Sequence, residues 1–208
     1  MPPAPPTPLA LRLAAEADFP TLWAHFRILG FEQGGESAVV LKLGDVAAAP
    51  PLLRIHSQCL TGDVFGSLRC DCRQQLELAL AAIAAAGAGL LIYEDKEGRG
   101  IGLMNKLRAY ALQDQGADTV EANLRLGFAP DQRDYRLPAA ILNFLGARRV
   151  RLLSNNPDKL AALQSAGIAV VELVPCAPDA LSPHAQRYLE VKRDKLGHLR
   201  GDAPLVPE

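Results

Sequence analysis

The sequence lacks the features that mark membrane, secreted and nucleic-acid-binding proteins. Its longest uncharged apolar run, residues 78–93, is interrupted by Gly87 and Gly89 and is shorter than the roughly 18 residues that a membrane span needs. The proline-rich start, residues 1–8, has neither the basic segment nor the continuous apolar segment of a secretory signal. A formal net charge of −1 argues against a broad basic surface for polynucleotides. We therefore expect a cytoplasmic protein with no membrane and no nucleic acid among its partners.

The sequence also lacks a glycine- and serine-rich or charged linker, and this absence favours one domain. Hydrophobic residues make up 49% of the 208 residues and charged residues 22%, which is ordinary for a globular protein with a substantial core. We place the domain at residues 9–198, with flexible tails at residues 1–8 and 199–208.

Apolar β-rich runs and periodic helical runs are interspersed along the chain, which predicts a mixed α/β fold. Gly87 and Gly116 are placed to end two of the helices. The predicted strands are residues 38–43, 52–56, 89–93, 149–153 and 168–174, and the predicted helices are residues 74–86, 101–115, 158–166 and about 184–196.

Cysteine is scarce, but three of the four cysteines are close together in the pattern Cys59-x10-Cys70-x-Cys72. Thiolates are strong zinc ligands, and three protein ligands leave the fourth tetrahedral position for a reactive water. Two other interpretations stay open: His56 completes a closed structural zinc site, or the cysteines are small buried residues without a metal. Cys176, far downstream, is expected to be a packed or exposed thiol.

A glycine-rich segment, residues 97–103, joins a predicted strand to a predicted helix. Its glycines allow close backbone approach, a helix N-terminus presents unpaired N–H groups, and Arg99 adds a forked cation. The segment suits a phosphate group, although such turns are also common without a ligand.

Together these motifs resemble the GTP cyclohydrolase II family in their residues, order and spacing. The resemblance covers about residues 52–174 and suggests the form without an attached synthase domain. The matching segments are Arg54-Ile55-His56-Ser57-Gln58-Cys59-Leu60-Thr61-Gly62-Asp63, Ser67-Leu68-Arg69-Cys70-Asp71-Cys72, Glu97-Gly98-Arg99-Gly100-Ile101-Gly102-Leu103, Lys106-Leu107-Arg108-Ala109-Tyr110, Asp118-Thr119-Val120-Glu121-Ala122-Asn123, Asp131-Gln132-Arg133-Asp134-Tyr135 and Leu153-Ser154-Asn155-Asn156-Pro157.

The resemblance implies a hydrolase that opens the guanine imidazole ring of GTP, releases formate and pyrophosphate, and leaves a diaminopyrimidinone ribosyl phosphate for riboflavin synthesis. Cys59, Cys70 and Cys72 would bind one catalytic zinc ion per subunit, whose water attacks guanine C8, and Mg²⁺ would accompany the triphosphate. The family precedent suggests a homodimer. The implied GTP-binding residues are Arg54, Ile55, His56, Ser57, Gln58, Gln75, Glu97, Gly98, Arg99, Thr119, Ser154 and Lys159.

The resemblance also implies three catalytic residues. Tyr110 would act at the purine, Arg133 as the nucleophile at the phosphate, and Asp131 as a proton acceptor. Because a guanidinium keeps its proton below a pH of about 12, electrostatic stabilisation is the physical alternative for Arg133. Without the surrounding match, Asp131 and Arg133 would be interpreted as a surface ion pair and Tyr110 as a core residue.

The sequence departs from the usual family pattern at Lys96, Gln58 and Ser154, where glutamine, glutamate and threonine are common. The departure at residues 94–96 supports an alternative in which a paralogue acts on another purine nucleotide in a secondary pathway. A second alternative is a zinc-stabilised binding domain without catalysis, in which the metal supports folding alone.

Overall fold

The computed structural model describes residues 10–129 and 133–176. The strands are β1 (Arg12–Pro20), β2 (His25–Gln33), β3 (Glu36–Leu43), β4 (Leu52–Ser57), β5 (Gly89–Glu94), β6 (Arg149–Leu153) and β7 (Ala169–Val174). The helices are α1 (Leu60–Asp63), α2 (Cys72–Ala86), α3 (Leu103–Asp114), α4 (Thr119–Arg125), α5 (Arg136–Phe144) and α6 (Pro157–Ser165), with a 3-10 turn η1 (Glu97–Gly100).

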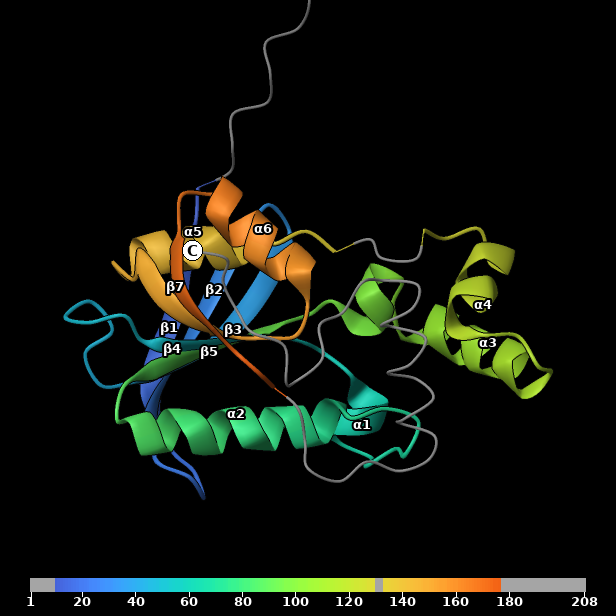
Figure 1. Ribbon diagram of the computed structural model, residues 1–208, viewed down its shortest axis with the longest axis horizontal. Helices are drawn as coiled ribbons and strands as arrows, with labels where there is room; N and C mark the ends of the chain where they lie inside the picture. Colours follow the sequence, from blue (N-terminus) through green and yellow to red (C-terminus); the bar gives the residue numbers. More distant parts are fainter. Residues whose placement is uncertain (1–9, 130–132, 177–208) are drawn as a thin grey trace, which may run out of the picture.

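All seven strands form one sheet in the order β1-β2-β3-β5-β4-β6-β7. The first three strands are an antiparallel meander that pairs through β3 with β5, whereas β5, β4, β6 and β7 run parallel. Helix α2 covers one face of the sheet, and α5 and α6 cover the other, while α3 and α4 extend beyond the sheet edge (Figure 1). The mixed α/β fold is therefore confirmed.

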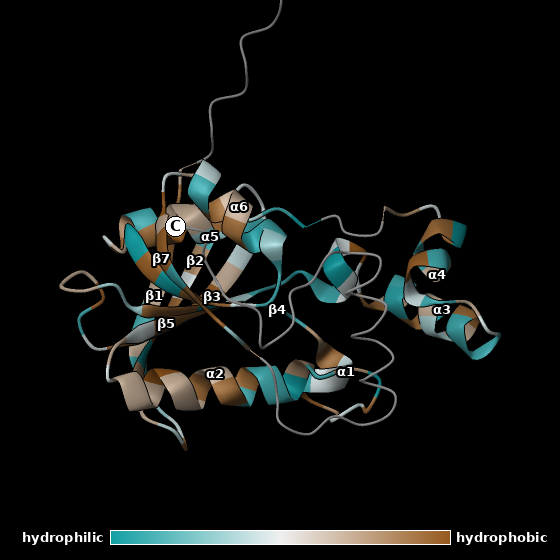
Figure 2. Cartoon of the chain, in the orientation of Figure 1, coloured by the Kyte–Doolittle hydropathy of each residue, from teal (hydrophilic) through white to brown (hydrophobic). Residues whose placement is uncertain are grey.

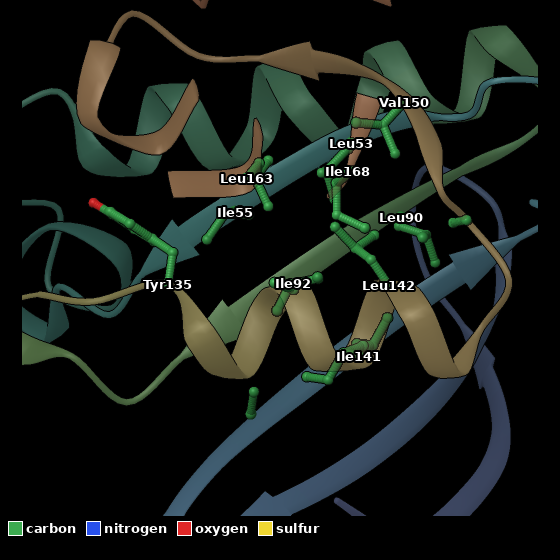
Figure 3. Close-up of a cluster of buried hydrophobic side chains, with 14 of the residues drawn as sticks. Leu53, Ile55, Leu90, Ile92, Tyr135, Ile141, Leu142, Val150, Leu163 and Ile168 are labelled. Atoms are coloured by element: carbon green, nitrogen blue, oxygen red, sulfur yellow. The ribbon is translucent and has the colours of Figure 1, made fainter. Parts of the chain in front are cut away.

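The hydrophobic core lies on both faces of the sheet because successive side chains of a strand point in opposite directions. In β5, Leu90 and Ile92 join the cluster beneath α5 and α6, which Figure 3 shows in close-up. Leu91 and Tyr93 join the cluster beneath α2. Figure 2 shows hydrophobic residues along the central strands, between the two helical layers.

The predicted elements that lie within the described residues agree with the structure to within a few residues. Strands β1 and β2 and helices α1, α4 and α5 were not predicted. Strand β1 is almost entirely exposed, so it has no buried alternation. Helix α3 begins at Leu103 rather than at residue 101, because Gly102 has a φ of 80°. The helix predicted at 184–196 lies outside the described residues. No helix of the described segments is long and apolar enough to cross a membrane.

Polar residues are buried where β4, β5 and β6 end at the same edge of the sheet. Glu94, the last residue of β5, is fully buried, and neither of its carboxylate oxygens has a hydrogen-bond partner among the described residues. Burial raises the pKa of Glu94 to about 7, and nearby Glu36 adds to this shift, although Lys159, Lys96 and Arg133 oppose it. The carboxyl edges of such sheets are the usual place for ligand sites.

The raised pKa of Glu94 predicts a pH-dependent cost in stability. Between the ordinary glutamate pKa of 4.5 and about 7, the folded chain holds a proton that the unfolded chain releases, so stability falls as pH rises through this window. Glu94→Gln should therefore raise the free energy of unfolding at about pH 8, by at most about 3 kcal/mol, and change it little at about pH 5.

Denaturant unfolding at both pH values measures this effect. The exposed Glu77 of α2, which pairs with Arg73, provides the control: Glu77→Gln should change stability by about 0 to 1 kcal/mol at either pH. An equal change at both pH values in Glu94→Gln would show that Glu94 is ionised throughout.

Candidate active site

The site is assembled from two segments that follow adjacent parallel strands. Cys59 lies two residues after β4 and directly before α1, while Cys72 begins α2. The segment after β5 folds into η1 and then α3. In η1, Gly98 and Arg99 both have a φ of 62°. A positive φ is uncommon for a residue with a side chain, so the loop is held in this shape by its surroundings.

The thiols of Cys59, Cys70 and Cys72 form a compact cluster. Their Sγ atoms all lie within 4.8 Å of one another, and the Sγ atoms of Cys59 and Cys70 are 3.6 Å apart. Tetrahedral zinc with Zn–S bonds of about 2.3 Å needs sulfur atoms about 3.8 Å apart. The cluster therefore fits a zinc ion. Cys176 is not part of it, because its buried thiol packs against α2, 3.8 Å from the carbonyl oxygen of Gln75.

The sequence did not reveal that Gly62 is part of this centre. A Cβ atom at Gly62 would lie 2.9 Å from the Sγ of Cys70 and 3.1 Å from the Sγ of Cys59. The backbone of α1 thus packs directly against the sulfur atoms, and any side chain at this position would displace them. The only sequence signal was the position of this glycine inside the cysteine motif.

His56 does not join the thiol cluster. Its Nε2 lies 3.1 Å from a carboxylate oxygen of Asp63, and its ring stacks on Tyr93 with 5.4 Å between the centroids. Asp63 also accepts hydrogen bonds from the Cys59 N–H (3.0 Å) and the Tyr93 hydroxyl (2.8 Å). Burial lowers the pKa of His56 and keeps the ring neutral. Among the described residues, the three thiols have no histidine or carboxylate as a fourth partner.

Tyr110 and Lys106 of α3 face the thiol cluster. The Tyr110 hydroxyl lies 3.2 Å from Oγ1 of Thr61, which is itself 3.7 Å from the Sγ of Cys59. The Arg69 guanidinium lies 4.7 Å from the Tyr110 ring centroid. Burial raises the pKa of Tyr110, so the phenol keeps its proton at neutral pH. The Lys106 ammonium contacts Cys59 and Glu97.

Side chains along β4 point alternately to the two faces of the sheet, and predicted site residues lie on both faces. On the α2 face, Arg54 donates to the Leu153 carbonyl (3.1 Å) and to Oε1 of Gln75 (2.6 Å). On the opposite face, Arg133 donates to Oγ of Ser57 (3.2 Å), and Lys159 of α6 donates to the Ile55 carbonyl (2.7 Å). On this second face the chain thus brings the half-buried Arg133 and the buried Lys159 close to the end of β4.

Tyr135 lies on the face opposite α2, next to Arg133 and Lys159. It directly precedes α5, and in Figure 3 its hydroxyl points away from the hydrophobic cluster. The Arg133 guanidinium and the Lys159 ammonium lie about 6.0 and 5.9 Å from its ring centroid. Both cations therefore share one aromatic neighbour, and Arg133 and Lys159 belong to the same part of the site.

The remaining predicted site residues are more dispersed. Gln58 and Glu97 help line a cavity of about 410 Å³, where Lys96 pairs with Glu36 at 2.6 Å. Ser154 is buried after β6, and its Oγ accepts the Asn156 N–H. Thr119 begins α4, which packs on α3. Asp131 lies outside the described residues.

Comparison with known proteins identifies relatives over nearly the whole chain. The family model described as GTP cyclohydrolase II matches residues 12–175. GTP cyclohydrolase-2 of Proteus mirabilis (strain HI4320) is 53% identical over 194 residues, covering 92% of this chain and 97% of that protein. GTP cyclohydrolase-2 of Escherichia coli (strain K12 / DH10B) is 52% identical, covering 92% of this chain and 98% of that protein.

A solved structure also aligns with the fold. It is RibBX, a two-domain 3,4-dihydroxy-2-butanone 4-phosphate synthase from A. baumannii, with a TM-score of 0.46 and 15% identity over 81% of this chain and 40% of that one. The assignment rests on the sequence matches, which are far closer and span both loops of the thiol centre. The chain belongs to the GTP cyclohydrolase II family.

Proposed function

We propose that this protein is a zinc-dependent GTP cyclohydrolase II, which catalyses the first committed step of riboflavin biosynthesis. It hydrolyses GTP to 2,5-diamino-6-(5-phospho-ribosylamino)pyrimidin-4(3H)-one, formate and pyrophosphate. The observation that carries the proposal is the cluster of three thiols with Tyr110 beside it, in a chain 53% identical to a GTP cyclohydrolase-2. Family membership makes GTP the substrate to test first.

Cys59, Cys70 and Cys72 would hold the zinc ion. Zinc with three protein ligands keeps one position for a water molecule and lowers the pKa of that water to about 7, which supplies a nucleophile near neutral pH. Asp63 holds the backbone of Cys59, and Gly62 lets α1 approach the sulfur atoms, so the backbone around the thiols helps to position them.

Tyr110 is the proposed proton donor at the purine. Its phenol stays protonated because burial raises its pKa, and Thr61 orients the hydroxyl next to Cys59. Ring opening and formate release each need a proton on a departing nitrogen, and a positioned acid contributes about 10²- to 10⁴-fold to such a step.

We assign the phosphate part of GTP to the face of Arg133 and Lys159. Arg133 binds Ser57 through a protonated guanidinium, and this favours charge stabilisation at the phosphate over a nucleophilic role. Mg²⁺ would offset the remaining triphosphate charge, and Asp131 would accept a proton. The residues proposed to contact GTP are Arg54, Ile55, His56, Ser57, Gln58, Gln75, Glu97, Gly98, Arg99, Thr119, Ser154 and Lys159. Homodimer formation is carried over from the family as part of this proposal.

Zinc content and turnover should depend on the same three thiols. Wild-type protein with GTP and Mg²⁺ should release formate and pyrophosphate, and Cys59→Ser, Cys70→Ser and Cys72→Ser should each lose zinc and formate release. Cys176→Ala should keep both, because its thiol lies outside the cluster. Metal analysis with product quantification measures this.

The same assay separates the alternatives. The departure from the family pattern at residues 94–96 makes other purine triphosphates worth testing. If one of them were turned over faster than GTP, that nucleotide would be the substrate. Zinc-dependent folding without turnover of any nucleotide would indicate a binding domain. Full activity in a zinc-free triple cysteine variant would refute zinc catalysis.

Removing the Tyr110 hydroxyl should impair the chemistry at the purine. Tyr110→Phe keeps the packing of the ring and deletes the hydroxyl, so formate release should fall about 10²- to 10⁴-fold while GTP affinity is retained. Because ring opening and formate release are separate hydrolyses, a formylated ring-opened nucleotide should accumulate. Chromatography with mass detection of the products would reveal it.

Tyr93→Phe is the comparison for this variant, since it removes a phenol that Asp63 binds on the other side of the centre. It should not accumulate the formylated nucleotide. Wild-type formate yield from Tyr110→Phe would reduce Tyr110 to a packing residue.

A further inference from the structure

A lysine side chain is buried against the metal-binding thiols. Lys106 lies on the second turn of α3, its side chain is 11% exposed, and its Nζ is 3.1 Å from the Sγ of Cys59. Lysine is almost never buried unless it is paired, because removing an ammonium from water is costly. We therefore expect a negatively charged partner that compensates for the burial of the ammonium.

Glu97 supplies that contact and fixes the position of the ammonium. Its Oε1 accepts hydrogen bonds from Lys106 Nζ at 2.7 Å and from the Gly98 N–H at 3.0 Å, while its Oε2 accepts the Leu60 N–H at 2.7 Å. Glu97 is itself buried, with 6% exposure. Its carboxylate thus ties the loop after β5 to the residue next to Cys59 and holds Lys106 toward the sulfur.

The charge of the zinc–thiolate cluster indicates a function for Lys106 and Glu97. Three thiolates around Zn²⁺ carry a net charge of −1, which one ammonium would neutralise. An N–H donor on a thiolate also withdraws electron density from the sulfur, and groups behind the ligands typically change metal affinity 10- to 100-fold. Both carboxylate oxygens of Glu97 accept hydrogen bonds from other residues of the protein, so this side chain is part of the metal centre.

We propose that Lys106, held by Glu97, is a positioning residue for the zinc centre: its ammonium hydrogen-bonds the Cys59 thiolate and balances the charge of the three-thiolate cluster. The proposal rests on the proposed zinc site. It assigns the side chain of Glu97 to the metal centre, so any contact of this residue with GTP falls on its backbone.

Metal binding by the whole protein tests the proposal without using turnover. Zinc affinity is measured by chelator competition, and the sulfur-to-cobalt charge-transfer bands are measured after cobalt substitution. Lys106→Met should weaken zinc binding about 10- to 100-fold and move these bands to longer wavelength, because the sulfur has lost its donor. Lys106→Arg, which keeps a cationic donor, should lie closer to the wild type than Lys106→Met in both measurements.

Arg108→Met is the matched control, because it removes one positive charge from the exposed side of the same helix, where Arg108 contacts Asn105. It should leave both measurements unchanged. An effect of Arg108→Met equal to that of Lys106→Met would mean that general charge, rather than the contact with Cys59, is responsible, and would overturn the proposal.

Lys106→Met leaves the buried Glu97 carboxylate without its cation, so this variant is at risk of misfolding. The double variant Glu97→Gln/Lys106→Met removes both charges and should fold with the same loss of affinity and the same band shift. Wild-type affinity and wild-type bands in either folded variant would overturn the role of Lys106. A wild-type protein that shows no cobalt–thiolate bands would instead overturn the zinc site itself, and this proposal with it.

Discussion

The parallel pairing of β4 with β5 brings together the two loops that form the site. The ladder pairs Ser57 with Glu94 at the ends of the two strands, and a hydrogen bond from the Gln58 N–H to the Glu94 carbonyl extends it by one residue. The loops that follow therefore leave the sheet at the same level. This common origin lets the Leu60 N–H reach Glu97 and lets α3 place Lys106 against Cys59.

Buried charged groups lie on both faces of the sheet edge at the site. The α2 face holds the thiols with the Lys106 ammonium beside Cys59. The opposite face holds Arg133 and Lys159 near the carboxylate of Glu94, which has no hydrogen-bond partner among the described residues. Each face separately suits one half of the proposed reaction, a metal-assisted hydrolysis of the purine and the binding of phosphate groups. The sheet edge between them would allow one nucleotide to reach both.

The sequence predicted the central strands, α2, α6 and the grouping of three cysteines, because these follow from local periodicity and close spacing. It left open whether His56 is a zinc ligand, and the structure instead pairs His56 with Asp63. Long-range contacts decide such questions: Lys106 meets a cysteine 47 positions earlier in the chain. Strand β1 was missed because pairing with β2, rather than burial of its own side chains, defines it.

In the proposed site, three thiolates hold zinc and leave one position for water. X-ray absorption at the zinc edge of the wild-type protein measures this coordination. We expect three sulfur neighbours at about 2.3 Å and one oxygen neighbour at about 2.0 Å, with the sulfur count unchanged in Cys176→Ala. Four sulfur neighbours, or zinc held by nitrogen and oxygen in place of the three thiolates, would contradict it.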